Sequence, residues 1–234
     1  MLKPFKLVLL VGLLLGMLAY MFVLDEEPNH PVMQSKVHDQ EPLVKIEMVK
    51  LPIGILMGKY EVTQGQWRAV MGNNPAFFSN CGDNCPVEQV NWDDVQDFIQ
   101  SINKQTGSHY RLPTEDEWYS ACQAASSHTH YCGSGSIDAV AWYKGDSGET
   151  TNTVGHKQAN AWDLYDMSGN VWEWTSTCWS GDCSGGCKVG NCPSRVSRGG
   201  SWDDSPEYAR ADYRFRTEIS DRYNTLGFRL AQDP

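Results

Sequence analysis

The chain has 234 residues, enough for one domain of roughly 180–200 residues with appendages. Its formal net charge of −10 and its pI near 5.0 argue against a general nucleic-acid binder, which normally carries a basic face. The hydrophobic share of 41% and the charged share of 21% are close to those of ordinary globular proteins.

The N-terminal part predicts a membrane anchor. Residues 7–24 form an uncharged, mostly apolar run of 18 residues, near the length that spans a bilayer as a helix. Two lysines precede the run and three acids follow it, which places residues 1–6 in the cytoplasm and the rest outside it, in the periplasm or at the cell surface. We therefore predict a single-pass signal anchor, with a cleaved signal peptide as the alternative. The polar residues 25–42 predict a flexible linker, followed by one domain over residues 43–234.

The cysteines agree with export. An even number, short spacings and loop-like surroundings favour disulfides in an oxidising compartment. The eight candidates are Cys81, Cys85, Cys122, Cys132, Cys178, Cys183, Cys187 and Cys192. In the run from 178 to 192 the neighbouring serines and glycines suit a nested pair of disulfides, and a zinc knuckle is the alternative.

Two short strands and a capped helix open the domain. Alternating apolar and polar residues within 43–56 predict a strand with one buried face, and residues 57–62 predict a second short strand. Thr63 and Gln66 have the spacing of a capping box, so we expect a helix that ends near Gly72.

Two further helices follow. Asn91 is a good N-cap for the longest one, which Gly107 ends. Its buried stripe is expected to comprise Trp92, Val95, Phe98, Ile99 and Ile102. Thr114 and Glu117 form another capping box, opening a helix through about Ala125. Residues 126–155 predict a long loop, and the chain has neither a glycine-rich phosphate loop nor a G-x-S-x-G elbow.

Three blocks rich in Trp, Gly and Arg occupy the last third of the chain, at residues 169–174, 198–202 and 226–229. Their period fits neither an amphipathic helix nor an alternating strand. We therefore expect them to form loops held together by side-chain networks.

Together with residues 57–67 and 110–118, these blocks resemble the formylglycine-generating enzyme family, also called sulfatase-modifying factors. The blocks occur in the family's order and cover roughly residues 45–232. The resemblance implies an α+β domain of the C-type-lectin-like kind, with little regular secondary structure and long loops.

The resemblance also implies a structural calcium site. The positions that match the family's ligands are Asp166, Gly169, Val171 and Glu173. Carboxylate and carbonyl oxygens are the hard ligands that calcium takes. The alternative is that Glu173 pairs with an arginine and Asp166 caps a turn.

The family's oxidase activity depends on a copper-binding pair of cysteines shortly after the Gly-Gly-Ser block. This chain has no cysteine from Pro193 to its end, and Asp203 and Asp204 cannot replace soft thiolates. We therefore expect no copper and no catalytic residues of that kind.

The first functional hypothesis is a binding module for an unknown protein or small ligand, displayed by the last segment. Its candidate contact residues are Asp203, Asp204, Glu207, Tyr208, Asp212, Tyr213, Phe215, Glu218 and Tyr223. The alternative for these acids is internal pairing with Arg210, Arg214 and Arg216.

Other hypotheses remain beside it. A narrower version of the binding module is a surface protein diversified by a retroelement. The enzyme alternative is a divergent oxidase or another metal-dependent oxidoreductase of the family, such as a mononuclear iron enzyme. That iron chemistry relies on histidine ligands in a separate helical domain, for which the sequence gives no match. A further alternative is an accessory subunit of an envelope complex.

Overall fold

The predicted N-terminal anchor and linker lie outside the residues that the structure describes. The computed structural model describes residues 44–125, 129–179 and 192–234. The expected anchor, the linker, Cys183 and Cys187 all lie outside these ranges. Within them no helix has the length and apolar character needed to cross a membrane. Membrane anchoring therefore stays a prediction.

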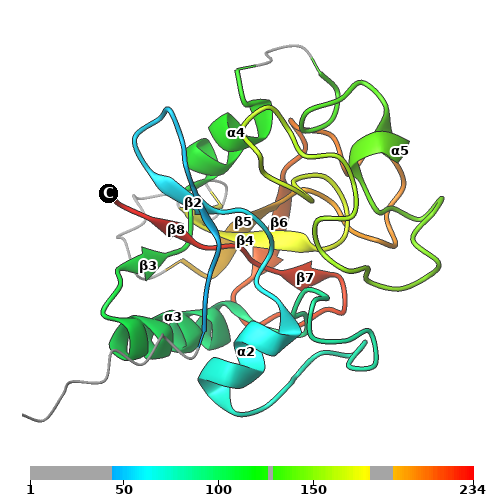
Figure 1. The fold of residues 1–234 in the computed structure, drawn as a ribbon. Coiled ribbons are helices and arrows are strands. Elements are labelled where there is room, and N and C mark those ends of the chain that lie inside the picture. Colours follow the sequence, from blue (N-terminus) through cyan, green and yellow to red (C-terminus); the bar gives the residue numbers. More distant parts are fainter. Residues whose placement is uncertain (1–43, 126–128, 180–191) are drawn as a thin grey trace, which may run out of the picture. The chain divides into compact units, whose positions relative to one another are not determined.

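Two four-stranded sheets form the framework (Figure 1). The first has the order β1-β2-β8-β3, and its pairs are antiparallel. Its strands are β1 (Met48–Lys50), β2 (Leu56–Gly58), β3 (Tyr110–Arg111) and β8 (Ala231–Gln232). This sheet joins the start of the domain to its end.

The second sheet has the order β6-β5-β4-β7. Its strands are β4 (Trp172–Cys178), β5 (Ser194–Arg198), β6 (Phe215–Glu218) and β7 (Leu226–Gly227). The β4–β5 and β5–β6 pairs are antiparallel, whereas β4 and β7 run parallel. All three terminal sequence blocks thus meet in one sheet.

The prediction of loops is wrong for parts of the first and third blocks, because residues 172–174 belong to β4 and residues 226–227 to β7. In the second block only Arg198 belongs to a strand, the end of β5, which the sequence analysis did not predict. The first four residues of β4 and all five of β5 are buried. A strand covered on both faces loses the alternation by which a half-exposed strand is recognised. The periodicity therefore gave no signal for them.

Four helices complete the described part of the domain: α2 (Gln64–Met71), α3 (Trp92–Thr106), α4 (Glu115–Gln123) and α5 (Ile137–Val140). The N-caps Thr63, Asn91 and Thr114 each form a full capping box, which confirms the three predicted helix starts. The short α5 was not predicted, since it lies inside the segment expected to be loop.

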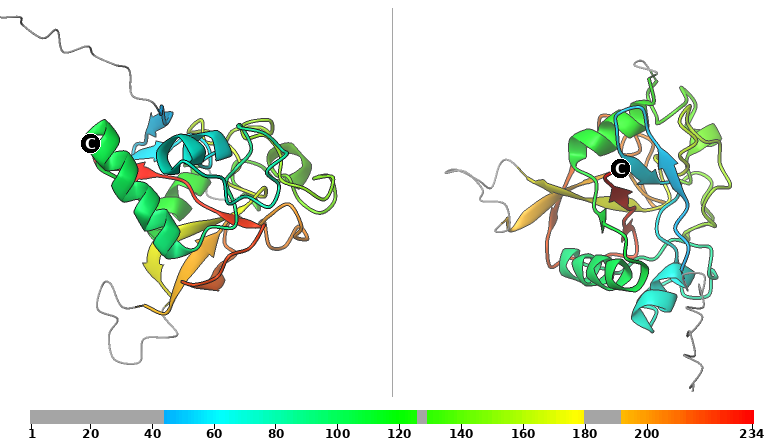
Figure 2. Two further views of the ribbon diagram at one scale, coloured as in Figure 1. Left: turned by 90° about the horizontal axis from the view of Figure 1, so that it is seen from below. Right: turned by 60° about the vertical axis from the view of Figure 1, so that its left-hand side comes forward.

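The helices pack on opposite sides of β4. Figure 1 and Figure 2 both show α3 on one side of that strand and α4 on the other. The predicted stripe of α3 is buried from Val95 to Ile102, and Trp67 stacks on Phe98 at 5.2 Å between ring centroids. Trp92 is only half-buried. Trp118 of α4 anchors a second apolar cluster.

Three disulfides are present, as predicted: Cys81–Cys85, Cys122–Cys132 and Cys178–Cys192. The first closes the loop between α2 and α3, and the second fixes α4 to the segment before α5. The third joins the end of β4 to the residues before β5 and is the outer member of the expected nest. It removes two of the four thiolates that a zinc knuckle would need.

A buried ion pair connects the two sheets. Arg229 donates from Nε to Glu173 Oε2 at 2.7 Å and from Nη2 to Glu173 Oε1 at 2.6 Å, and both side chains are 0% exposed. Arg229 also donates to the carbonyls of Gly58 and Tyr165. Trp118 Nε1 donates to Glu173 Oε2 at 2.6 Å. One guanidinium and one carboxylate therefore fix β2, α4, β4 and the C-terminal strand relative to one another.

We expect Glu173→Gln to lower the free energy of unfolding by about 3 kcal/mol, because the Arg229 guanidinium would remain buried without its counter-charge. Urea unfolding followed by tryptophan fluorescence measures this change. The control is Arg210→Gln in the exposed pair with Asp212, for which a much smaller loss is expected because solvent screens an exposed ion pair. Equal losses in the two variants would contradict the proposed importance of the buried pair.

Candidate ligand-binding site

The last segment encloses a pocket of 340 Å³, which we call the C-terminal pocket. Its lining comprises Trp172, Ser201, Asp203, Asp204, Tyr208, Phe215, Thr217, Tyr223, Thr225 and Leu226. Five of these were predicted as contact residues: Asp203, Asp204, Tyr208, Phe215 and Tyr223. The structure thus brings together side chains that lie up to twenty positions apart in that segment.

Aromatic rings build one side of the pocket. Trp172 opens β4 and Phe215 opens β6, with 5.2 Å between their ring centroids. Tyr213 supports them from outside the lining, because its ring lies 4.9 Å from that of Tyr208 and 6.0 Å from that of Trp172. Phe215 and Tyr223 keep exposed fractions of 40% and 46%, so their rings are accessible to a ligand.

The block at 198–202 holds the opposite side. Arg198 is buried and donates to the carbonyls of Ala211 at 2.7 Å and Tyr213 at 2.6 Å, which fixes the turn before β6. Gly200 has φ +77°, and a Cβ there would lie 2.8 Å from Ala209 Cα. Only glycine permits this close approach, so the block sets the path of the chain around the pocket.

The block at 169–174 fixes the other wall. Gly169 has φ +80°, and a Cβ would lie 2.2 Å from the carbonyl oxygen of Trp142. Asn170 accepts the backbone N–H of Trp202 on its carbonyl at 2.8 Å. Trp202 Nε1 in turn donates to the carbonyl of Asn224 at 2.9 Å. The blocks at 169–174 and 198–202 therefore act as the frame for the side chains between them.

The two acids of the pocket differ in environment. Asp204 is half-buried and accepts a hydrogen bond from Ser201 Oγ on Oδ2. Burial raises the pKa of Asp204, while hydrogen bonds from Ser201 and Trp172 oppose that rise. Asp203 is more exposed, and its Oδ1 lies 3.3 Å from Lys144 Nζ. Asp204 is thus the inner carboxylate and Asp203 the outer one.

Four predicted contact residues do not line the C-terminal pocket. Glu207 is exposed beside it, and Tyr213 lies behind its rings. Asp212 pairs with Arg210, and Glu218 pairs with Arg216. The alternative of internal pairing therefore holds for these last two acids.

The predicted set omitted half of the lining. Trp172, Ser201 and Leu226 belong to the blocks that resemble the family, Thr225 precedes the last block, and Thr217 lies in β6. The blocks were recognisable in the sequence by their resemblance to the family. That resemblance did not distinguish residues of the scaffold from residues that line a pocket. Only the pairing of β4 with β5 and β7 shows that the scaffold residues also face the pocket.

A second pocket of 440 Å³ adjoins the first and shares Asp203 with it. Its walls include Phe77, Phe78 and Trp202. Phe78 meets Trp202 edge to face at 5.1 Å, and Phe77 is 65% exposed. No sequence pattern indicated Phe77 and Phe78, because they lie in the irregular loop between α2 and α3.

Glu88 holds that loop. Its two carboxylate oxygens accept the backbone N–H groups of Phe77 at 3.0 Å and Phe78 at 2.8 Å. The residue is 0% exposed, and burial raises the pKa of Glu88 to about 7 although the two hydrogen bonds oppose this. The loop position therefore depends on a carboxyl group with an unusually high pKa.

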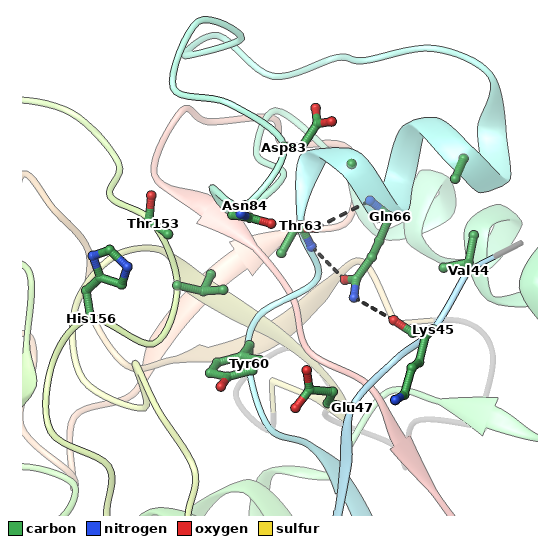
Figure 3. A pocket seen from close by; sticks show the side chains of 13 residues that line it. Val44, Lys45, Glu47, Tyr60, Thr63, Gln66, Asp83, Asn84, Thr153 and His156 are labelled. Carbon is green, nitrogen blue, oxygen red and sulfur yellow. Dashed lines mark hydrogen bonds between the residues drawn. The ribbon is translucent and has the colours of Figure 1, made fainter.

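A third pocket, of 480 Å³, lies elsewhere, between β1, the start of α2 and the loop at 153–156 (Figure 3). Tyr60, His156 and Glu47 face it in Figure 3. Several of its polar groups already serve the fold: Gln66 caps α2 and donates to the carbonyl of Lys45 at 3.0 Å. It contains fewer rings than the C-terminal pocket, and we assign it no role.

The residues expected to bind calcium surround the start of β4. Both oxygens of Glu173 are taken by Arg229 and Trp118, so the pairing alternative describes Glu173. Asp166 accepts the Gly155 N–H on Oδ2 at 2.7 Å, whereas its Oδ1 is buried without a partner. Among the residues that the structure describes, no three His, Cys, Asp or Glu side chains are arranged to hold a metal. Calcium stays a prediction, with Asp166 as its open donor.

The buried charges in this region do not balance. Glu61, Asp166 and Glu173 are each at most 2% exposed, and Arg229 is the basic group paired among them. Burial raises the pKa of Glu61 well above its usual range, and it raises that of Asp166 to about 6. The cluster therefore favours a bound proton or an added cation.

The comparisons with known proteins decide the family. A family model described as "Sulfatase-modifying factor enzyme 1-like domain" matches residues 27–234. The chain belongs to this family. The predicted resemblance and the formylglycine-generating-enzyme-type fold, with mixed helix and sheet, are thereby confirmed.

Three relatives show the family's functional range. Chaperone protein LppX of Paenibacillus barcinonensis is 32% identical over 209 residues, covering 67% of this chain and 72% of that protein. The formylglycine-generating enzyme of Mycobacterium tuberculosis is 30% identical over 200 residues, covering 72% and 63%. The inactive C-alpha-formylglycine-generating enzyme 2 of Bos taurus is 28% identical over 163 residues, covering 62% and 50%. The chain thus spans between half and about two thirds of the last two.

Solved structures agree on the fold. Treponema denticola variable protein 1 has a TM-score of 0.69 at 28% identity, covering 77% of this chain and 84% of that one. PvdO from Pseudomonas aeruginosa has a TM-score of 0.64 at 24% identity, covering 81% and 92%. The relatives of this domain therefore include enzymes as well as proteins of other kinds.

The Glu88 carboxyl predicts a pH dependence. Because its folded pKa of about 7 lies above the unfolded value near 4.5, the folded state holds the extra proton between these values. Stability should therefore fall as the pH rises from about 4.5 through 7, with a contribution from this group of up to roughly 3 kcal/mol. Urea unfolding at pH 5, 6, 7 and 8 measures the slope.

Glu88→Gln should flatten this slope, even if the variant is less stable at every pH. Asp97→Asn on α3 serves as the matched control and should keep the wild-type slope, because that side chain is exposed. An unchanged slope in Glu88→Gln would show that other buried acids carry the dependence.

Proposed function

We propose that this chain is a membrane-anchored, extracytoplasmic sulfatase-modifying-factor-type domain that binds a protein or a small ligand at its C-terminal pocket and lacks oxidase activity. The observation that carries the proposal is the pocket itself: accessible rings and carboxylates are held by a rigid frame and contain no thiolate. Aromatic and charged groups on a rigid frame suit recognition.

The missing cysteines argue against the oxidase alternative. Copper(I) chemistry needs soft thiolate ligands, and the chain from residue 193 onward offers none. Six of the eight cysteines are already in disulfides. The inactive bovine relative supports the idea that this fold can be retained without the activity.

The relatives favour a polypeptide as the ligand. The Paenibacillus relative is named a chaperone, and a chaperone acts on another protein. Export and anchoring are supported by the disulfides together with the charge pattern around residues 7–24. We therefore place the binding partner outside the cytoplasm, with the anchor keeping the domain near the membrane.

The Treponema structure supports a narrower proposal, because that protein is named a variable protein. In that version the side chains around the C-terminal pocket are diversified while the frame is kept. The discriminating observation is a near-copy of the terminal DNA segment beside a reverse-transcriptase gene.

An oxidase assay separates the binding module from the enzyme. The full-length chain in detergent should bind no stoichiometric copper(I) and should not oxidise a cysteine-containing sulfatase peptide in the presence of oxygen. The formylglycine-generating enzyme of Mycobacterium tuberculosis is the positive control. Stoichiometric copper with repeated turnover in this chain would overturn the proposed function.

A structural calcium ion is a second proposal, supported by the unpartnered Asp166 Oδ1 and the excess of buried carboxylates. Asp166 would hold the ion with the backbone carbonyls of Gly169 and Val171, since calcium accepts such mixed oxygen donors. Glu173 would remain beside the site in its pair with Arg229.

Removing calcium with a chelator should lower the melting temperature. The loss should correspond to about 2–3 kcal/mol relative to calcium at a hundred times its Kd. Asp166→Asn should abolish the sensitivity, whereas Asp163→Asn in the exposed pair with Lys59 should keep it. Glu173→Ala is not a suitable test, because it would leave Arg229 buried and unpaired. Identical melting curves with and without chelator would exclude the ion.

A further inference from the structure

We propose that the C-terminal pocket binds the cationic end of a lysine or arginine side chain from a partner polypeptide. This inference rests on the proposed binding function and adds the chemical class of the ligand. It follows from the charge of the lining, from the partners of Asp204 and from the position of the rings.

The lining is acidic and contains no base. Of its ten residues two are carboxylates and none is Lys, Arg or His. An anion entering the pocket would meet Asp204 and Asp203, and burial would make their repulsion stronger than at an open surface. A cation would meet the opposite field. The pocket therefore selects for positive charge.

No cation among the described residues pairs with Asp204. Other acids of the domain are paired: Asp94 with Arg222, Asp163 with Lys59, and Asp212 with Arg210. The side-chain partners of Asp204 are the hydroxyl of Ser201 and the indole of Trp172, both uncharged. Two neutral donors thus orient its half-buried carboxylate. A cation bound in the pocket would neutralise its charge.

The same carboxylate explains why a ligand cation is favourable. Burial raises the pKa of Asp204, which means that its charged form lacks solvation in the free protein. A guanidinium or ammonium group would restore that solvation with a charge-assisted hydrogen bond. The Lys144 side chain is 68% exposed and pairs with the outer acid Asp203 instead.

The rings supply the second half of the recognition. Trp172, Tyr208, Phe215 and Tyr223 all line the pocket. A cation is attracted to the face of an aromatic ring within about 6 Å of its centroid. The domain already uses this contact elsewhere, since Lys157 Nζ lies 4.2 Å from the Trp142 ring and the Arg195 guanidinium lies 4.2 Å from the Trp92 ring.

The shape of the ligand follows from the remaining lining. Leu226 and the rings offer apolar contact to an alkyl stem, while Thr217 and Thr225 offer hydroxyl groups. A volume of 340 Å³ accommodates a single long side chain. Long basic side chains combine such a stem with a charged head, so they match the pocket better than a compact inorganic cation does.

The test compares ligands that differ mainly in charge. The full-length chain in detergent is titrated by calorimetry with N-acetyl-arginine amide, N-acetyl-lysine amide and the neutral N-acetyl-citrulline amide. We expect the arginine and lysine probes to bind at least tenfold more tightly than the citrulline probe. Raising the salt concentration should weaken only the charged probes.

Two variants examine the two halves of the site. Asp204→Asn keeps the shape of the side chain and should reduce the preference for arginine over citrulline at least tenfold. Tyr223→Leu replaces a ring that is 46% exposed and should weaken the charged probes severalfold. Asp212→Asn is the control outside the pocket and should bind like the wild type. Near-UV circular dichroism confirms that each variant is folded.

Equal affinity for arginine and citrulline probes would overturn the cation inference, and so would an unchanged preference in Asp204→Asn. Tighter binding of tetramethylammonium than of either amino-acid probe would contradict the proposal that the bound cation belongs to a polypeptide. Oxidase turnover in the copper assay would instead remove the proposed function itself. A partner captured by the wild type and lost in Tyr223→Leu, without any preference for charge, would leave the binding function standing and refute its cation specificity.

Discussion

The buried pair of Glu173 and Arg229 is the interaction on which the rest of this domain depends. The carboxylate is on the central strand β4, and the guanidinium lies between β7 and β8 at the end of the chain. Because neither group has access to water, each must be satisfied by the other and by Trp118, Gly58 and Tyr165. Those partners come from both sheets and from α4, so the charge requirement of two side chains fixes the arrangement of the elements.

The frame formed in this way determines what the surface can do. Gly169 and Gly200 allow backbone contacts that any side chain would obstruct, and Arg198 binds the carbonyls of the turn before β6. Between Gly200 and β6 lie Asp203, Asp204 and Tyr208, which line the C-terminal pocket. Neutral donors set the position of Asp204, and no cation among the described residues pairs with it. A single segment thus combines structural blocks with an acidic, aromatic pocket.

Local chemistry made much of the fold predictable. The three helix starts and the stripe of α3 from Val95 to Ile102 were predicted correctly, because helix ends and helix faces depend on residues a few positions apart. Close cysteine spacings likewise indicated the disulfides. The central strands β4 and β5 were missed, because burial on both faces removes their alternation. Phe77 and Phe78 were missed as well, since their position depends on a hydrogen bond from each backbone N–H to the distant Glu88.

The sequence by itself determined the family, the starts of three helices, the disulfide chemistry and the absence of a cysteine pair in the last segment. These properties depend on residue types and on short spacings along the chain. The tertiary structure alone decided that Glu173 pairs with Arg229, that no cation in the described part of the chain pairs with Asp204 and that five of the nine candidate contact residues share one pocket. The physical reason is that burial and charge pairing depend on distances between strands that lie far apart in the chain. The order of residues does not fix those distances until the sheets have formed.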